Sequence, residues 1–388
     1  MNQNPYAPPM EQHPTFEQLG LEPVLLRAVR ALGYEVPTPI QREGIPPILA
    51  GRDVIGTAQT GSGKTAAFLL PILQRLHAQP PGRTRTLVLT PTRELAAQIE
   101  AALHDLGRGG RVRGKAVYGG VGMGPQEDAL RRGVDVVVAT PGRLLDHMGR
   151  RNVDFRNLQV LVLDEADRML DMGFLPDVRR IVDTLPKDRQ TLLFSATMSP
   201  EVEGLARGIL RNPVRIAVSP PHRPPSTIRH EAYPVPQHLK TGILERLLGR
   251  EDMMSVLVFV RTKRRADRVA RQVGLAGFSV ARIHGDRSQS QREAALGGFR
   301  DGRHQILIAT DVAARGIDVV GITHVINYDV PMVPTDYVHR VGRTARMEAE
   351  GDAITLVAPE EEGDFRAIEQ ILGRSIGRVT FPDFDYLA

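Results

Sequence analysis

The chain of 388 residues contains no cysteine. Disulfide bonds and cysteine-ligated zinc or iron–sulfur sites are therefore excluded, and this absence suits a reducing compartment. We therefore expect a cytoplasmic protein.

Long apolar runs are also missing. No run approaches the roughly 18 residues that a membrane-spanning helix requires, and the first stretch, MNQNPYAPPMEQH, lacks the basic-then-apolar order of a signal peptide. We expect a soluble protein without a membrane anchor. Residues 1–15 are expected to be disordered, and residues 379–388 to form a short tail.

Lysine is scarce, and nearly all basic residues are arginine. Codon bias explains this simply, but it makes the position of each lysine informative. The net charge of +5 is mild, so it raises the idea of nucleic-acid binding without deciding it. The lysines are Lys64, Lys115, Lys187, Lys240 and Lys263.

Short apolar runs recur along the chain, and each stops at a polar or glycine-rich turn. Such continuous runs fit buried parallel strands. Helix-compatible stretches lie between them, for example Arg93 to Leu106 and Glu201 to Leu210, so both halves predict an α/β fold with an open parallel sheet. The runs are TLVLTPTRE, DVVVATPGR, VLVLDEAD, TLLFSAT, VLVFVRTK, ILIATDVAARG, HVINYD and ITLVAP.

A proline-rich segment, AVSPPHRPPSTIRHE, interrupts this pattern between residues 217 and 231. It predicts a linker at 219–230 between a first domain, 16–218, and a second, 231–378, with an ordinary surface loop as the alternative. Ligands of such sheets gather at the carboxyl ends of the strands, so we expect the chemistry in a cleft between the domains.

A phosphate-binding loop is predicted after the apolar stretch at 53–57. Its glycines let backbone amides surround phosphate oxygens, Lys64 reaches the outer phosphates, and Thr65 binds magnesium at the start of a helix. The strict pattern begins with glycine where this chain has alanine; a chance Gly-Ser-Gly turn is the alternative. The loop consists of Ala58, Gln59, Thr60, Gly61, Ser62, Gly63, Lys64 and Thr65.

The run VLVLDEAD places two carboxylates at the end of a strand. Asp164 would hold the magnesium through water, and Glu165 would orient and deprotonate the attacking water. A helix N-cap is the alternative reading of these acids.

Three arginines recur at every third residue in HRVGRTAR: Arg340, Arg343 and Arg346. Arginines supplied across a cleft stabilise the charge on a transferring phosphate, which would make hydrolysis depend on domain closure. A solvated basic face is the alternative.

With the sequence DEAD at residues 164–167, the chain resembles the DEAD-box RNA helicases of superfamily two, from about Phe16 to about Pro359. The resemblance implies two RecA-like domains and tolerates alanine at Ala58. The stretch GYEVPTPIQ resembles the family's adenine-reading motif, in which Gln41 bonds the base and Phe16 packs on it, which implies ATP.

The resemblance also implies a set of RNA contacts, in PTREL, a glycine pair, TPGR and the segments HGD and ATDVAARGID. These residue types suit a sugar–phosphate backbone rather than base edges. Gly316 and Asp318 would instead meet the nucleotide. The implied RNA contacts are Pro91, Thr92, Arg93, Gly119, Gly120, Thr140, Gly142, Arg143, Gln289, Arg292 and Thr310.

Other residues would couple hydrolysis to strand separation. By resemblance, the hydroxyls of Ser195 and Thr197 bond the DEAD carboxylates, including Asp167. His339 and Arg340 would tie the last motif to this group, while the other two arginines of HRVGRTAR act as fingers. The continuation TARMEAEG departs from the family's usual glycine-arginine-rich stretch and resembles the bacterial RhlE-like branch.

The expected function is therefore an ATP- and Mg²⁺-dependent RNA helicase whose domains close on RNA and melt short duplexes. The alternatives are a non-unwinding RNA clamp, a DNA-directed helicase and a nucleotide-dependent switch. We expect a monomer with ribonucleoprotein or RNA-decay partners.

Overall fold

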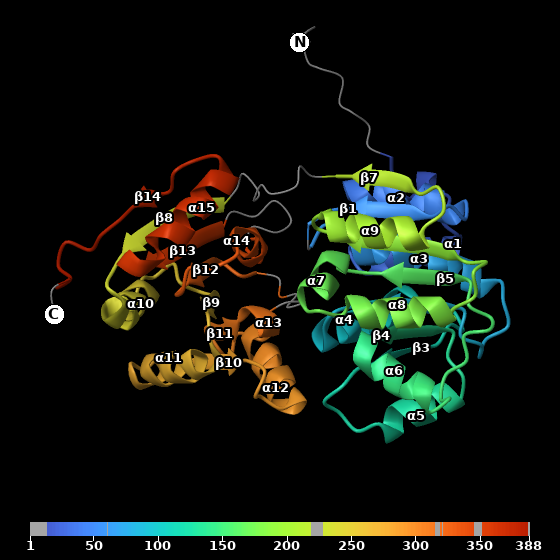
Figure 1. The fold of residues 1–388 in the computed structure, drawn as a ribbon. Helices are drawn as coiled ribbons and strands as arrows, with labels where there is room; N and C mark the ends of the chain where they lie inside the picture. The colour runs from blue at the N-terminus through green and yellow to red at the C-terminus, as the bar shows by residue number, and fades with distance from the viewer. Residues whose placement is uncertain are drawn as a thin grey trace, which may run out of the picture.

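The computed structural model describes residues 14–59, 61–218, 228–314, 319, 321–344 and 351–386. These residues form two lobes, each a sheet of seven parallel strands with helices on its faces (Figure 1). The predicted fold class is confirmed. No helix in these ranges is long and apolar enough to cross a bilayer.

In the first lobe, every two successive strands are separated by one or two helices. Its sheet has the order β3-β4-β2-β5-β6-β1-β7. Its elements are η1 Phe16–Leu19, α1 Pro23–Ala31, α2 Pro39–Leu49, β1 Val54–Thr57, α3 Lys64–His77, β2 Thr86–Leu89, α4 Arg93–Leu106, β3 Gly114–Val117, α5 Gly124–Arg131, β4 Val136–Ala139, α6 Pro141–Gly149, β5 Val160–Leu163, α7 Ala166–Asp171, α8 Leu175–Thr184, β6 Gln190–Ser195, α9 Pro200–Ile209 and β7 Val214–Ala217.

The second lobe repeats this plan. Its sheet has the order β10-β11-β9-β12-β13-β8-β14. Its elements are β8 Ile228–Pro234, η2 Gln237–Leu239, α10 Lys240–Leu248, β9 Val256–Val260, α11 Lys263–Leu275, β10 Val280–Ile283, α12 Gln289–Arg300, β11 Ile306–Thr310, α13 Asp311–Ala314, β12 His324–Asn327, α14 Pro334–Val341, β13 Gly351–Val357, η3 Pro359–Glu361, α15 Glu362–Leu372 and β14 Gly377–Arg378.

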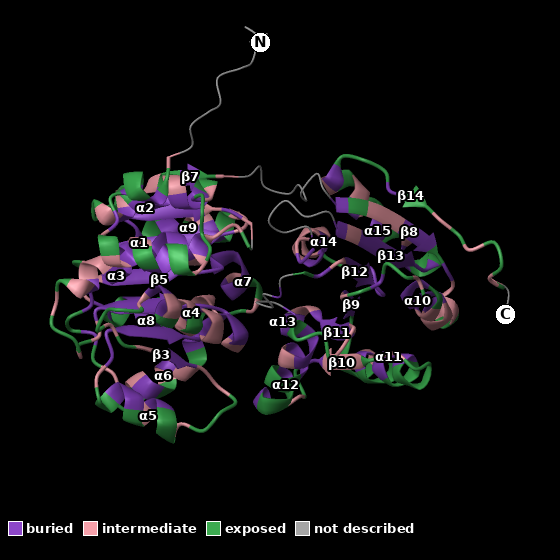
Figure 2. Cartoon of the chain, turned by 180° about the vertical axis from the view of Figure 1, so that it is seen from behind, coloured by how far each residue is buried: buried purple, intermediate pink, exposed green. Residues whose placement is uncertain are grey.

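The two sheets have the same strand order. Counted from the first strand of each, both read 3-4-2-5-6-1-7. Figure 2 shows the strands buried between exposed helix faces in both lobes, with α7 and α13 where the lobes meet. Because all strands are parallel, their carboxyl ends share one edge of each sheet, where polar side chains can gather.

Polar residues at the strand ends also start the helices. Thr92 and Thr262 each follow the second strand of their sheet, and each accepts a hydrogen bond from a backbone N–H three residues later, at 3.3 Å and 3.2 Å. Such N-caps satisfy a backbone donor that the helix itself cannot. Each threonine therefore fixes the residue at which the helix after the strand begins.

Two segments differ from the sequence-based boundaries. Residues 228–230, placed in the predicted linker, are the first residues of β8. Residues 379–386, placed in the tail, pack on the second sheet, where the Phe381 ring lies 5.3 Å from the ring of Tyr233. The rest of the predicted linker, 219–227, lies outside the described residues.

Candidate active site

The predicted phosphate loop connects β1 to α3. Gly61 and Gly63 have φ of +84° and +90°, a region that glycine enters without strain. Lys64 is 6% exposed, and its ammonium donates to the carbonyls of Ala58 (2.6 Å) and Gln59 (3.1 Å). The loop and the N-terminus of α3 thus form a cationic cradle. Thr60 lies outside the described residues.

Gln41 connects the predicted adenine-reading motif to this loop. Its side-chain carbonyl accepts from Thr38 N–H at 2.9 Å, and its amide donates to the Gly63 carbonyl at 3.2 Å. A Cβ at residue 63 would lie 2.5 Å from Nε2 of Gln41, so glycine is required there. Phe16 is buried and lines a neighbouring cavity of about 380 Å³.

Asp164 and Glu165 follow β5, and both are buried. Burial raises the pKa of Asp164 to about 7, although the ammonium of Lys64 opposes the shift. Burial also acts to raise the pKa of Glu165, but Arg168, Arg343 and Lys64 together hold it below its usual value. Glu165 is therefore ionised at neutral pH, as a general base must be.

Asp167 ties this segment to the end of β6. Its Oδ2 accepts from the Thr197 hydroxyl at 3.0 Å and from the Thr197 and Ala196 amides at 2.8 and 3.2 Å. The Ser195 hydroxyl accepts from Asp167 N–H at 3.2 Å and donates to the Thr197 carbonyl at 2.7 Å. The structure thus brings these residues together, but only the Thr197 hydroxyl bonds a DEAD carboxylate as expected; the Ser195 hydroxyl bonds backbone groups instead.

The second domain contributes side chains to the same place. Arg343 lowers the pKa of Glu165, and His339 lowers that of Asp167, although burial acts in the opposite direction on both carboxyls. A small cavity between the domains is lined by Arg168 of the first domain and by residues of the second: Phe259, Asp311, Ala314, Asp336, His339, Arg340 and Arg343.

Arg340 bonds within its own domain. Its guanidinium makes a bidentate pair with Asp311 at 2.6 and 2.7 Å and donates to the carbonyl of Asp329 at 2.7 Å. No bond from Arg340 to the DEAD segment or to residues 195–197 is present in the described part of the chain. Gly316, Asp318 and Arg346 lie outside the described residues.

The first domain brings its predicted RNA contacts to one edge of the sheet. A Cβ at Gly120 (φ +82°) would overlap the Arg93 guanidinium, and a Cβ at Gly119 would lie 3.7 Å from Arg93 Nη2 and 4.0 Å from Arg143 Nη2. Arg143 donates to the Val121 carbonyl at 3.2 Å. The other predicted residues there, Pro91, Thr92, Thr140 and Gly142, stand at the starts of α4 and α6.

The corresponding edge of the second domain reaches across the cleft. Thr310 ends β11, and Gln289 and Arg292 lie in the first turn of α12. Arg292 Nη2 lies 2.8 Å from Glu94 Oε1 of the first domain. The pair meets the distance of an ion pair but not the angles of a hydrogen bond. Glu94 Oε1 therefore has an ion-pair partner but no hydrogen bond, and Arg292 Nε and Gln289 Oε1 are also buried without hydrogen-bond partners among the described residues.

The sequence-based reasoning missed several residues of this site. Glu94 stands inside PTREL, and Arg168 follows DEAD three residues after Glu165, a spacing at which helix side chains meet. Both signals were available in the sequence. Asp311 directly follows Thr310, but only its contact with Arg340 marks it as part of the site.

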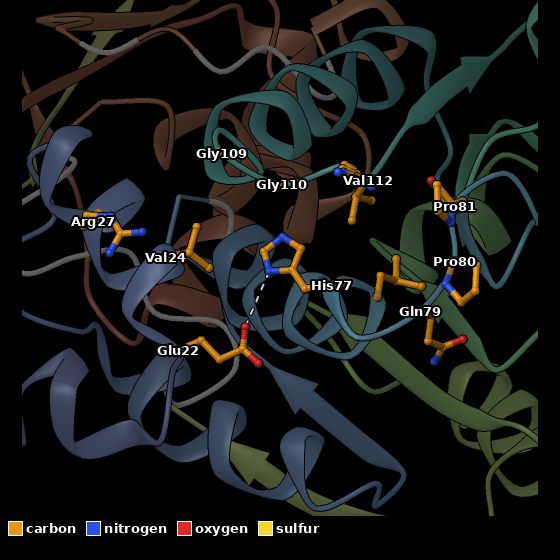
Figure 3. Close-up of a pocket in the computed structure, with 13 residues that line it drawn as sticks. Glu22, Val24, Arg27, His77, Gln79, Pro80, Pro81, Gly109, Gly110 and Val112 are labelled. Atoms are coloured by element: carbon orange, nitrogen blue, oxygen red, sulfur yellow. Dashed lines mark ion pairs between the residues drawn. The ribbon is translucent and has the colours of Figure 1, made fainter.

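A third cavity, of about 590 Å³, lies at the C-terminal end of α3 (Figure 3). Figure 3 shows His77 beside Glu22, whose carboxylate is 3.6 Å from Nδ1 of His77, with Arg27, Val24 and the Gly109–Gly110 turn around them. The described residues that line this cavity include none of the predicted site residues. The larger volume of this cavity is therefore no sign that it is the active site.

No group of three or more His, Cys, Asp or Glu side chains in the described ranges could hold a metal ion. Thr65 and Asp164 nevertheless fit a magnesium ion carried in on a nucleotide. Mg²⁺ is typically bound by one or two protein oxygens together with substrate phosphates and water. A nearby dication would also offset the cost of ionising the buried Asp164 carboxyl.

Two family models match the chain: "DEAD/DEAH box helicase" over residues 38–205 and "Helicase conserved C-terminal domain" over residues 239–348. The DEAD-box ATP-dependent RNA helicase CshA of Bacillus subtilis (strain 168) is 42% identical over 371 residues. The match covers 96% of this chain and 75% of the relative.

Two solved structures of Dbp5 from S. cerevisiae are similar to the chain to different degrees. The structure bound to RNA and ADP BeF3 is 32% identical, covers 94% of this chain and 95% of that one, and gives a TM-score of 0.86. The structure of a Dbp5 variant bound to Nup159, a Gle1 variant, IP6 and ADP is 30% identical. The match covers 94% of this chain and 96% of that one and gives a TM-score of 0.67. The domains are therefore arranged more as in the RNA-bound structure.

Proposed function

Because this chain belongs to the DEAD-box helicase family and is an ATP-dependent RNA helicase, we propose that its cleft combines two sites that form together on domain closure. One site processes ATP, and the other holds RNA. The observation that carries this proposal is the small cavity between the domains, whose wall contains Arg343 of the second domain and Arg168 of the first, the residue that bonds the buried Glu165.

In the nucleotide site, Gln41 and Phe16 would select adenine, and the loop from Ala58 to Thr65 would hold the phosphates with Lys64. Thr65 and Asp164 would hold Mg²⁺, which supplies positive charge next to the outer phosphates when it is bound. Gly316 and Asp318 would complete this site from the second domain.

Hydrolysis would begin with Glu165 taking a proton from the attacking water. Arg343 and Arg346 would stabilise the negative charge that develops on the transferring phosphate. Because these arginines belong to the second domain, an open cleft would leave the first domain with a base but without its fingers. Hydrolysis would therefore depend on closure.

The RNA site would follow the shared edge of the two sheets. Arg93 and Arg143 would contact phosphates, and the amides near Gly119 and Gly120 would approach the backbone closely. Two buried polar atoms without hydrogen-bond partners among the described residues lie near this edge: Arg292 Nε, which could donate to a phosphate or ribose oxygen, and Gln289 Oε1, which could accept from a ribose hydroxyl. The remaining contacts are proposed at Pro91, Thr92, Thr140, Gly142 and Thr310.

Closure would favour a bent single strand over a duplex and so separate short helices locally, while Asp167, Ser195 and Thr197 couple this state to the nucleotide site. A second candidate is an RNA clamp whose ATPase times release, because the same residues would serve it. Strand displacement on a short duplex distinguishes the two. A cytoplasmic location, a monomeric state and ribonucleoprotein partners remain predictions.

The first test is steady-state ATP hydrolysis with and without single-stranded RNA, with a DNA strand of matched sequence and a Glu165→Gln variant as controls. RNA should stimulate turnover more than DNA does, and the variant should lose turnover with either strand. Turnover by the wild type that RNA leaves unchanged would remove the proposed RNA site while leaving the nucleotide site in place.

A further inference from the structure

Arg168 is a buried arginine at the junction of the nucleotide site and the second domain. It follows the DEAD sequence in α7, is 2% exposed, and belongs to none of the roles assigned above. A buried guanidinium needs a partner, because desolvating an unpaired charge is costly.

Its partner is the Glu165 carboxylate. Arg168 Nη1 donates to Glu165 Oε2 at 3.0 Å, and the side chains of Arg168 and Glu165 are 3% and 5% exposed. Charge-assisted hydrogen bonds of this kind are stronger and more directional than neutral ones. The bond therefore restricts the Glu165 carboxylate to one orientation.

The backbone at Glu165 shows that this orientation is imposed. Its φ of 53° and ψ of 52° lie in the left-handed region, which residues other than glycine rarely adopt. Asp164 contributes to holding this turn, since its Oδ1 accepts from the Glu165 N–H at 3.0 Å. The turn directs the carboxylate, and Arg168 fixes its end.

Arg168 also faces the small cavity between the domains. Among the described residues that line this cavity, only Arg168 belongs to the first domain. The other walls come from the second domain and include Asp336, Arg340 and Arg343. An arginine in that place is enclosed by the second domain when the cleft is closed and loses those walls when the cleft opens.

We propose that Arg168 is a positioning residue for hydrolysis, which holds the Glu165 carboxylate toward the attacking water in the closed arrangement of the domains. Arg168 does not contact the reacting atoms in this role; it acts through Glu165. The inference rests on the proposed role of Glu165 as the base.

The test is steady-state turnover of Arg168→Met and Arg168→Lys in full-length protein with saturating RNA. A general base contributes about 10²- to 10⁴-fold to the rate, so loss of its orientation should lower kcat by roughly 10- to 100-fold. The KM values for ATP and RNA should change far less, since binding is retained. Lysine can supply one charge-assisted bond and should restore part of kcat.

Arg180→Met is the matched control, because Arg180 lies three residues after Asp177, 3.6 Å from its carboxylate, on the exposed face of α8. It should leave kcat unchanged. Thermal unfolding of each variant separates a lower rate from a smaller folded fraction. RNA-free turnover should fall less than RNA-stimulated turnover in Arg168→Met, because the enclosing walls belong to the closed state.

The decisive comparison uses Glu165→Gln. If Arg168 acts through Glu165, then Arg168→Met should cause little further loss in single-turnover hydrolysis when residue 165 is already glutamine. Equal losses in both backgrounds, or an unchanged kcat in folded Arg168→Met, would overturn the inference. Full activity of Glu165→Gln would instead remove the proposed base itself.

Discussion

The ion pair between Glu94 and Arg292 allows a quantitative test of domain closure. The two residues come from different domains and are 5% and 9% exposed, so water cannot replace a lost partner. Removing one partner of a buried interfacial pair typically costs about 2–5 kcal/mol. Since about 1.4 kcal/mol corresponds to a tenfold change, Glu94→Gln should lower the equilibrium constant for closure by roughly 30-fold or more.

The assay is ATP hydrolysis as a function of RNA concentration. If RNA binds the closed arrangement, the RNA concentration that gives half-maximal turnover should rise by a similar factor in Glu94→Gln and in Arg292→Gln. Because the chain has no cysteine, one cysteine introduced into each domain can carry a fluorophore, and energy transfer then reports closure directly.

The double variant Glu94→Gln/Arg292→Gln should be less impaired than the sum of the single changes, because it leaves no unpaired buried charge. Additive effects would show that the two side chains act independently. Single variants that close on RNA as readily as the wild type would refute the reasoning altogether.

Three further predictions concern single residues. Gly120→Ala should weaken RNA binding by about tenfold and spare RNA-free turnover, because the new Cβ displaces Arg93, as filter binding can measure. Lys240→Met should lower the free energy of unfolding by about 1–3 kcal/mol in chemical denaturation, because it removes the buried donor to Glu361 Oε2 and the Tyr328 carbonyl, while Arg261 still pairs with Glu361 Oε1. Burial raises the pKa of Asp164 in the folded state to about 7, above its value in the unfolded chain. The protein should therefore be more stable at low pH, where Asp164 is protonated, and should lose this stability as the pH rises to about 7. Asp164→Asn should remove that loss when the free energy of unfolding is measured against pH.

Each of these predictions has a matched control. Gly124→Ala adds a Cβ in open space and should leave RNA binding unchanged. Lys115→Met breaks a half-exposed pair with Glu100 and should cost less than about 1 kcal/mol. Asp146→Asn removes one negative charge from an exposed carboxylate and so controls for the change in net charge. A control that matches its test variant would contradict the corresponding prediction.

The sequence predicted the central strands and the position of the glycine-rich loop between β1 and α3, since both depend on local patterns. Apolar runs define β2, β4, β5 and β6, and the glycines define the loop. The edge strands β3 and β10 went unnoticed because they are only partly buried and carry polar residues such as Lys115 and Arg282. An edge strand has a neighbour on one side only, so its polar side chains can still reach water.

The pairings across the cleft could not be predicted in the same way. Glu94 and Arg292 are almost 200 residues apart, and no local pattern indicates that they meet. Arg340 was expected to reach the DEAD segment by resemblance, whereas its guanidinium bonds Asp311 and Asn327 inside its own domain. Such contacts depend on how the two lobes are placed relative to each other. The apolar periodicity of the sequence carries no information about that placement.

The shared strand order gives Lys64 a counterpart. In each sheet, the first α-helix after the first strand begins with a lysine, Lys64 in α3 and Lys240 in α10. Lys240 is fully buried, and its ammonium bonds the Glu361 carboxylate and donates to the Tyr328 carbonyl at 2.8 Å. A phosphate arriving there would meet a lysine that is already neutralised. The two halves thus resemble a duplicated unit in which, among the described residues, the lysine of one copy donates only to loop carbonyls, while that of the other is paired with a carboxylate of its own domain.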